Sequence, residues 1–149
     1  MALGNLDEIY RDDLILDHRR HPRNPDHLSG ADIVADGVNP FCGDEIHLQI
    51  VLDEHSRVSQ VGFQGEGCSI NQATGSMLSE AIKGLTLPEA ESLSDSFHRM
   101  MQGPDPTPAQ LDQLGDLGTL AKVKEFPVRI KCALLAWSTL EDGIYSRGR

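Results

Sequence analysis

Residues 44–68 read DEIHLQIVLDEHSRVSQVGFQGEGC, and this stretch decides the fold. Apolar side chains occupy every second position from Ile46 to Leu52, and the alternation resumes around Phe63 after a polar turn. A period of two is typical of a strand with one buried and one more polar face. Two such strands joined by a short turn predict an antiparallel hairpin. Residues 33–38 are expected to add a third strand.

Outside this hairpin, apolar residues recur at helical spacing. Helices are expected from residue 5 or 7 to 19 or 20, from 68 to 83, from 86 to about 101, and from 127 to about 145. Thr86 and Glu89 resemble a capping box, and Pro127 suits a first helical position. A turn-rich stretch is expected at 111–120. The sequence therefore predicts one α+β domain spanning residues 1–149, with a small antiparallel three-stranded sheet packed against several helices.

The chain has 149 residues and a formal net charge of −10, which argues against a nucleic-acid partner and against an anionic membrane surface. No apolar run reaches the roughly 18 residues of a membrane-spanning helix. The N-terminus lacks the basic and apolar regions of a signal peptide. These features predict a cytoplasmic protein, in which cysteines more often bind metals or act in catalysis than form disulfides.

The three cysteines lie in three separate motifs. Cys42 lies in a Pro/Gly turn two residues before Asp44, Cys68 lies at the expected start of a helix, and Cys132 lies in the last helix. Antiparallel pairing of the hairpin brings the first two motifs together. Three thiolates and one carboxylate would supply the four ligands of a tetrahedral zinc site. A shared metal site is therefore the hypothesis to test.

Each cysteine also has an interpretation without a metal. Cys132 sits in an apolar run and could be a small core residue. Cys68 could be a helix-start thiol whose pKa is lowered by the helix dipole. Cys42 could be a free thiol in an exposed turn. No pair has the C-x-x-C spacing that makes zinc sites easy to recognise, so the residues alone leave these alternatives open.

The histidines and the basic residues around position 20 add little to this hypothesis. All six histidines are expected to be solvated surface residues. The basic residues either complement the dipole of the first helix at its C-terminus or form a docking patch for an acidic partner. This cluster consists of His18, Arg19, Arg20, His21 and Arg23.

Three motifs, in this order, closely resemble the IscU/NifU-like iron–sulfur cluster assembly family. They read PFCGD at 40–44, GEGCSINQA at 65–73 and FPVRIKCALLAW at 126–137. The first helix also resembles that of the family, so the resemblance covers nearly the whole chain. Lys131 stands where scaffold proteins of the IscU type have a histidine, and the segment from about 89 to 119 is longer. Both features are similar to the SufU-like branch.

This resemblance implies a zinc site with Arg129 close to it. The implied ligands are Cys42, Asp44, Cys68 and Cys132. It further implies a sulfurtransferase whose Cys42 accepts persulfide sulfur from a pyridoxal-phosphate-dependent cysteine desulfurase of the SufS type. A ligand exchange at the docked interface would free the Cys42 thiolate, and Arg129 would stabilise it. Downstream cluster scaffold proteins are further expected partners, whereas nucleic acid and membrane are not.

Two other functions remain to be distinguished from sulfur transfer. Three thiolates and one labile oxygen ligand would also suit a scaffold for a transient iron–sulfur cluster, although the ammonium of Lys131 is no ligand. Alternatively, the zinc is purely structural and the domain is an interaction module. Structural zinc sites are usually closed and rich in cysteine, which an aspartate ligand fits poorly.

Overall fold

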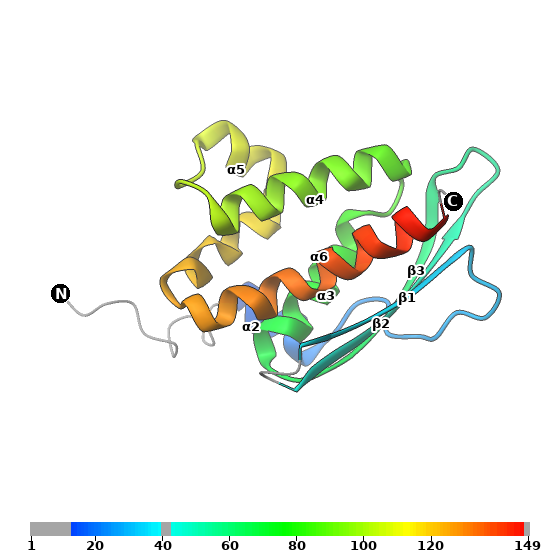
Figure 1. The fold of residues 1–149 in the computed structure, drawn as a ribbon, viewed down its shortest axis with the longest axis horizontal. Helices are drawn as coiled ribbons and strands as arrows, with labels where there is room; N and C mark the ends of the chain where they lie inside the picture. The colour runs from blue at the N-terminus through cyan, green and yellow to red at the C-terminus, as the bar shows by residue number, and fades with distance from the viewer. Residues whose placement is uncertain (1–12, 40–42, 148–149) are drawn as a thin grey trace.

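The structure is a computed structural model and describes residues 13–39 and 43–147 (Figure 1). Its strands are β1 (Ile33–Asn39), β2 (Asp44–Leu52) and β3 (Val58–Glu66). Its helices are α2 (Asp13–Arg20), α3 (Ser69–Ala81), α4 (Leu87–Gln102), α5 (Pro108–Leu114), the 3₁₀ segment η1 (Gly115–Glu125) and α6 (Pro127–Arg147).

The three strands form one antiparallel sheet in the order β1-β2-β3, as the sequence predicts. Leu48 lies opposite Phe63 in the central hairpin, and both side chains are buried. Helix α6 packs on β1, and α3 packs on β3. The ribbon shows both helices on the same face of the sheet (Figure 1). The hairpin register places Glu45 opposite Glu66, so the start of β2 lies beside the end of β3.

The second face of the sheet is less polar than the alternation suggests. Gln49 belongs to the expected polar face, yet it is buried. The backbone N–H of Leu28 donates to its Oε1 at 3.4 Å. The chain that precedes β1 also bonds to β3, because the N–H of Phe63 donates to the carbonyl of Asn24 at 2.8 Å. This irregular segment covers part of the outer face and removes Gln49 from water.

The expected helices are present, and the ends that lie in the described residues agree closely with prediction. Helix α2 ends at Arg20, whereas its expected start lies outside the described residues. The capping box of Thr86 and Glu89 opens α4, and Pro127 is the first residue of α6. The expectation of turns at 111–120 is wrong, because α5 and η1 occupy this stretch. A second capping box, formed by Thr107 and Gln110, starts α5.

His18 is also an exception, because it is buried rather than solvated. Its Nδ1 lies 2.7 Å from Oγ of Ser76 in α3, and the backbone N–H of Arg23 donates to the same oxygen at 2.9 Å. Burial, and then the nearby guanidinium of Arg23, hold the pKa of His18 below its ordinary value. Arg23 itself pairs with Asp17. Two members of the basic cluster therefore tie α2 and the following turn into the fold.

The core lies between the helices and the inner face of the sheet. Trp137 of α6 stacks on Phe97 of α4, with ring centroids 5.2 Å apart. Helix α6 approaches β1 closely at Gly37, where an added Cβ would lie 2.0 Å from Oγ1 of Thr139. Within the described residues, none of the helices combines the length and the apolar character needed to cross a lipid bilayer.

Candidate metal centre

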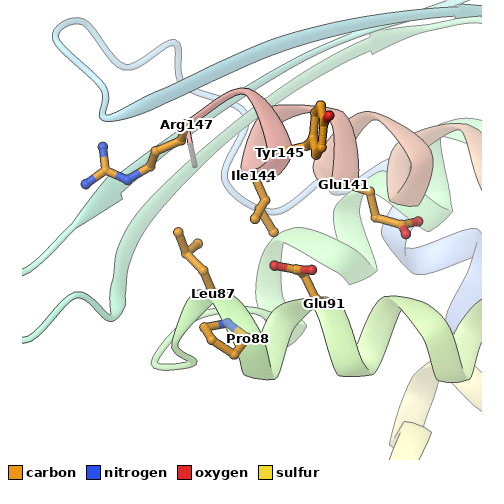
Figure 2. A pocket seen from close by; sticks show the side chains of 7 residues that line it. All are labelled: Leu87, Pro88, Glu91, Glu141, Ile144, Tyr145 and Arg147. Carbon is orange, nitrogen blue, oxygen red and sulfur yellow. The ribbon is translucent and has the colours of Figure 1, made fainter. Parts of the chain in front are cut away.

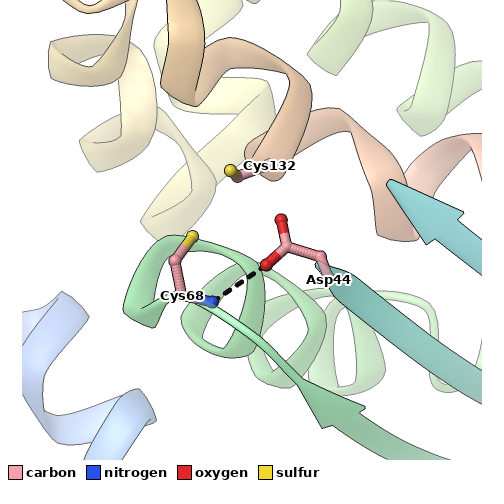
Figure 3. Close-up of side chains that lie close together, drawn as sticks. All are labelled: Asp44, Cys68 and Cys132. Atoms are coloured by element: carbon pink, nitrogen blue, oxygen red, sulfur yellow. Dashed lines mark hydrogen bonds between the residues drawn. The ribbon is translucent and has the colours of Figure 1, made fainter. Parts of the chain in front are cut away.

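Three of the four predicted ligands converge at one end of the sheet (Figure 3). Asp44 is the first residue of β2, Cys68 is the N-cap of α3, and Cys132 lies in the second turn of α6. Their ligand atoms all lie within 4.8 Å of one another. Asp44 and Cys132 are fully buried, and Cys68 is half-buried. The fourth predicted ligand, Cys42, lies outside the described residues.

The two oxygens of the Asp44 carboxylate have different surroundings. Its Oδ1 accepts a hydrogen bond from the backbone N–H of Cys68 at 2.9 Å (Figure 3). Its Oδ2 is buried and has no hydrogen-bond partner in the described part of the chain. An unpartnered buried carboxylate oxygen is costly unless a cation compensates it. Asp44 therefore carries one buried oxygen without a hydrogen-bond partner in the described residues, and the nearby thiol of Cys132 interacts with this carboxylate.

Gly67 makes this arrangement possible. Its φ of +129° lies in a region that other residues rarely adopt, and an added Cβ would lie 2.0 Å from Oδ1 of Asp44. Any side chain at position 67 would therefore displace the carboxylate. Gly43, immediately before Asp44, also has a positive φ of +70°. Two glycines thus set the backbone on both sides of the contact between Asp44 and Cys68.

The two thiols differ sharply in acidity. The hydrogen bond from the Cys132 thiol lowers the pKa of Cys68 to about 6, with further help from the backbone N–H groups of Asn71 and Ile70. Burial and the Asp44 carboxylate oppose this shift. The pKa of Cys132 is raised, first by its hydrogen bond to Cys68, then by burial and the nearby Asp44. Without a cation, the sulfur charge therefore lies on Cys68 while Cys132 keeps its proton.

This donor set fits zinc. Zinc–sulfur bonds of about 2.3 Å place neighbouring tetrahedral ligands roughly 3.8 Å apart. Ligand atoms that already lie within 4.8 Å of one another need only small shifts to share one ion. A divalent cation would also compensate the charge on Oδ2 of Asp44. It would stabilise the thiolate form of Cys132, which keeps its proton when no cation is bound. Asp44, Cys68 and Cys132 could thus hold three of the four positions around zinc.

Arg129 and Lys131 both precede Cys132 on α6. Arg129 is half-buried and lies three residues before Cys132, a spacing that places both side chains on the same side of a helix. Lys131 is exposed. That Arg129 stabilises a freed Cys42 thiolate stays a prediction.

Two amide side chains beside the centre were not predicted from the sequence. Nδ2 of Asn71 donates to the carbonyl of Glu66 at 3.2 Å, and Nε2 of Gln72 donates to the carbonyl of Gly67 at 2.9 Å. The signal was available in the sequence, because amide side chains in a first helical turn readily bond to nearby backbone groups.

A surface cleft of about 980 Å³ lies away from this centre, between the start of α4 and the end of α6 (Figure 2). Leu87 and Pro88 line it on one side, and Ile144 and Tyr145 line it on the other. None of its lining residues belongs to the group of Asp44, Cys68 and Cys132. The centre therefore does not open into this cleft.

The described fold has close structural relatives, and these define its class. A crystal structure from Fervidobacterium islandicum AW-1 superposes with a TM-score of 0.84 and 31% identity, covering 94% of this chain and 99% of that chain. That protein is named as a candidate iron–sulfur cluster assembly scaffold protein for the SUF system. The three-stranded sheet with its helices is therefore the α+β fold of SufU-like and NifU-like proteins.

The sequence comparisons lead to the family itself. Residues 9–146 match the family described as NifU-like N terminal domain, and the chain belongs to this family. The zinc-dependent sulfurtransferase SufU of Bacillus subtilis (strain 168) is 46% identical over 141 residues, which cover 95% of this chain and 92% of that protein. The iron–sulfur cluster assembly scaffold protein IscU of Streptococcus pyogenes serotype M1 is 40% identical, covering 97% and 87% respectively.

Proposed function

We propose that this chain is a zinc-dependent sulfurtransferase of iron–sulfur cluster assembly. It accepts persulfide sulfur from a pyridoxal-phosphate-dependent cysteine desulfurase of the SufS type, and passes the sulfur to downstream cluster scaffold proteins. It acts in the cytoplasm as one SufU/IscU-like domain over residues 1–149. Its metal ligands are Cys42, Asp44, Cys68 and Cys132.

The observation that carries this proposal is the convergence of Asp44, Cys68 and Cys132 within 4.8 Å, with Oδ2 of Asp44 buried and unpartnered in the described residues. Sequence identity of 46% to a relative named as a zinc-dependent sulfurtransferase supports the same conclusion. Lys131 is exposed and offers no ligand in its ammonium form, which favours a site of three thiolates and one carboxylate.

Each residue has a distinct role in this mechanism. Zinc, when bound, supplies the positive charge that keeps its thiol ligands deprotonated. Asp44, Cys68 and Cys132 hold the metal. The Cys42 thiolate attacks the outer sulfur of the donor persulfide, forming a new S–S bond while the bond to the donor cysteine breaks. The donor cysteine leaves as a thiolate, so the transfer needs no external oxidant or reductant. Arg129 stabilises the Cys42 thiolate before attack.

Substitution of Cys42 tests the sulfur-acceptor role. We expect Cys42→Ala to abolish acceleration of a cognate cysteine desulfurase, because Cys42 is the proposed sulfur acceptor and the other two cysteines of the chain, Cys68 and Cys132, hold the metal. Desulfurase turnover with and without the added chain is the measurement, and the metal content of both proteins is determined in parallel. Undiminished acceleration by Cys42→Ala would rule out sulfur transfer through this residue. A Cys42→Ala variant that keeps zinc but accepts no sulfur would instead rule out a domain that is only an interaction module built on structural zinc.

Scaffolding of an iron–sulfur cluster is the second candidate, because the Streptococcus pyogenes relative is named for that role. Anaerobic purification followed by metal analysis separates the two functions. Stoichiometric zinc without visible cluster absorption supports sulfur transfer. Reconstitution to a stable brown protein that donates its cluster to an apoprotein supports the scaffold.

A further inference from the structure

Asn71 is a buried polar residue in the first turn of α3, three residues after Cys68. Its Nδ2 donates to the carbonyl of Glu66 at 3.2 Å. Its Oδ1 is also buried, and within the described residues this oxygen has no hydrogen-bond partner. Its backbone N–H lies within hydrogen-bonding reach of the Cys68 sulfur.

A half-satisfied amide is a costly occupant of a buried position. An apolar residue of similar shape would avoid the unpartnered oxygen, at the cost of the hydrogen bond to Glu66. The only side-chain hydrogen bond of Asn71 within the described residues is the one to Glu66. The contribution of Asn71 is therefore to fix the backbone just before Cys68 through this hydrogen bond.

The conformation of this backbone segment is only weakly restricted by its own residues, so hydrogen bonds from side chains are needed to fix it. Gly67 has no side chain, and its φ is +129°. The carbonyls of Glu66 and Gly67 accept hydrogen bonds from Asn71 and Gln72 respectively. On the other side, the N–H of Cys68 donates to Asp44. Consecutive peptide groups from Glu66 to Cys68 are thus each fixed by a side chain.

We infer that Asn71, assisted by Gln72, is a positioning residue for the metal centre, which orients the Cys68 sulfur toward Asp44 and Cys132. This inference rests on the proposed metal site. Residues that orient metal ligands through hydrogen bonds typically change metal affinity by roughly 10–100-fold when they are removed. Asn71 acts through the turn and does not itself bind the metal.

The test is Asn71→Leu in the full chain, with three measurements. Zinc affinity is measured by competition with a chromophoric chelator, ligand geometry by the absorption bands of the cobalt-substituted protein, and stability by urea unfolding of the metal-free protein. We expect zinc affinity to fall roughly 10–100-fold and the cobalt bands to shift. The urea midpoint of the metal-free protein should change little, because the substitution removes the unpartnered oxygen together with the single hydrogen bond to Glu66.

Thr74→Val is the matched control. Thr74 is equally buried in the same helix, and its Oγ1 donates to the carbonyl of Ile70 at 2.7 Å, away from the Glu66–Cys68 turn. This variant should keep the zinc affinity and cobalt spectrum of the wild type. Gln72→Ala removes the more exposed hydrogen bond and should reduce zinc affinity less than Asn71→Leu does.

The outcomes separate this inference from the site on which it rests. If the wild type binds zinc and Asn71→Leu binds it equally well, the positioning role is wrong while the metal site stands. If Asn71→Leu loses zinc only in proportion to lost metal-free stability, the role is structural and the inference fails. A wild type that binds no zinc overturns both. Should Asn71→Leu not fold, Asn71→Ala combined with Gln72→Ala decides, and unchanged zinc affinity there overturns the inference.

Discussion

Helix α3 carries a polar cluster at each end, and the two clusters differ in whether the protein completes them. Around Ser76 and Ser79, the side chains of His18 and Asn24 and the backbone of Arg23 bond to serine oxygens of the helix. None of these polar atoms appears among the buried groups without partners in the described residues. This serine cluster is closed by the protein alone.

The cluster at the N-terminus of α3 is open. Oδ2 of Asp44 and Oδ1 of Asn71 are both buried without partners in the described part of the chain. Two thiols and a carboxylate crowd together, and only one of the thiols is acidic. Buried polar groups are normally satisfied, so an unsatisfied group in a folded protein needs an explanation, and a bound ion is one such explanation. The difference teaches that the serine cluster stabilises the fold, whereas the Cys68 end could hold a cation.

The largest expected effect comes from Asp44→Asn, which should nearly abolish zinc binding. The asparagine keeps an oxygen for the N–H of Cys68 but puts a neutral amide nitrogen where Oδ2 stood. Loss of a ligand should exceed the roughly 10–100-fold cost of losing a residue that only orients one. The measurement is zinc per chain after dialysis against a chelator. Metal-free stability should stay equal or rise, since a buried charge beside Cys68 is removed. Retained stoichiometric zinc would break the comparison.

The next largest effect is expected for a substitution in the serine cluster. Ser76→Ala removes the partner of both the His18 ring and the backbone N–H of Arg23. Each unsatisfied group costs about 1–3 kcal/mol, so the loss of a partner for two groups should lower the free energy of unfolding by about 2–6 kcal/mol in urea titrations. Zinc content should not change, because Ser76 lies eight residues, or about 12 Å along the axis, from Cys68. Parallel loss of zinc would show that the two clusters are not independent.

Asn24→Ala should have a smaller effect on stability. Asn24 has a φ of +55°, and its Nδ2 donates to Ser79 and Glu80. Alanine loses these hydrogen bonds and is strained in the left-handed region, which costs about 1–2 kcal/mol. Asn24→Gly is the matched control, because glycine relieves the strain while it loses the same bonds. Equal unfolding free energies for both variants would show that strain contributes nothing.

The smallest effect is a pH dependence that arises at His18. Because its pKa in the folded state is lowered, the folded protein favours the neutral ring. This contribution to stability is complete above the ordinary value of 6.5 and is lost as the pH falls through the folded pKa. Arg23 reinforces the shift, while Asp17, Asp116 and Glu80 oppose it.

The urea midpoint of the wild type should therefore fall more steeply than that of His18→Gln between about pH 8 and pH 5. Glutamine cannot take up a proton, so the difference between the two curves isolates the imidazole from other titrating groups. Parallel curves would mean that the serine cluster accommodates the protonated His18 ring without a loss of stability.

The sequence predicted those features that depend on near neighbours. Period-two alternation identified the hairpin, and the hairpin in turn placed Asp44 beside Cys68. The approach of Cys132 could not be read from spacing and came from the family resemblance. Cys42 stays a prediction, because it lies outside the described residues.

Features that depend on partners distant in the sequence were not predicted. The burial of His18 depends on Ser76, which is 58 residues away, and the burial of Gln49 depends on an irregular segment around Leu28. Helix α5 was missed for a different reason. Its capping box at Thr107 lies within a proline-rich run that resembles a loop, and the local pattern of Thr107 and Gln110 outweighs that composition.

The close contact between Gly67 and Asp44 limits how this sequence can change over evolutionary time. A Cβ at position 67 would occupy the space of the carboxylate oxygen, so a side chain there is compatible only with a shorter or absent group at position 44. The two positions, 23 residues apart in the chain, are therefore expected to be mutationally coupled: a substitution at one narrows what the other can accept. A residue with no chemistry of its own thereby protects the identity of the one oxygen donor in the centre.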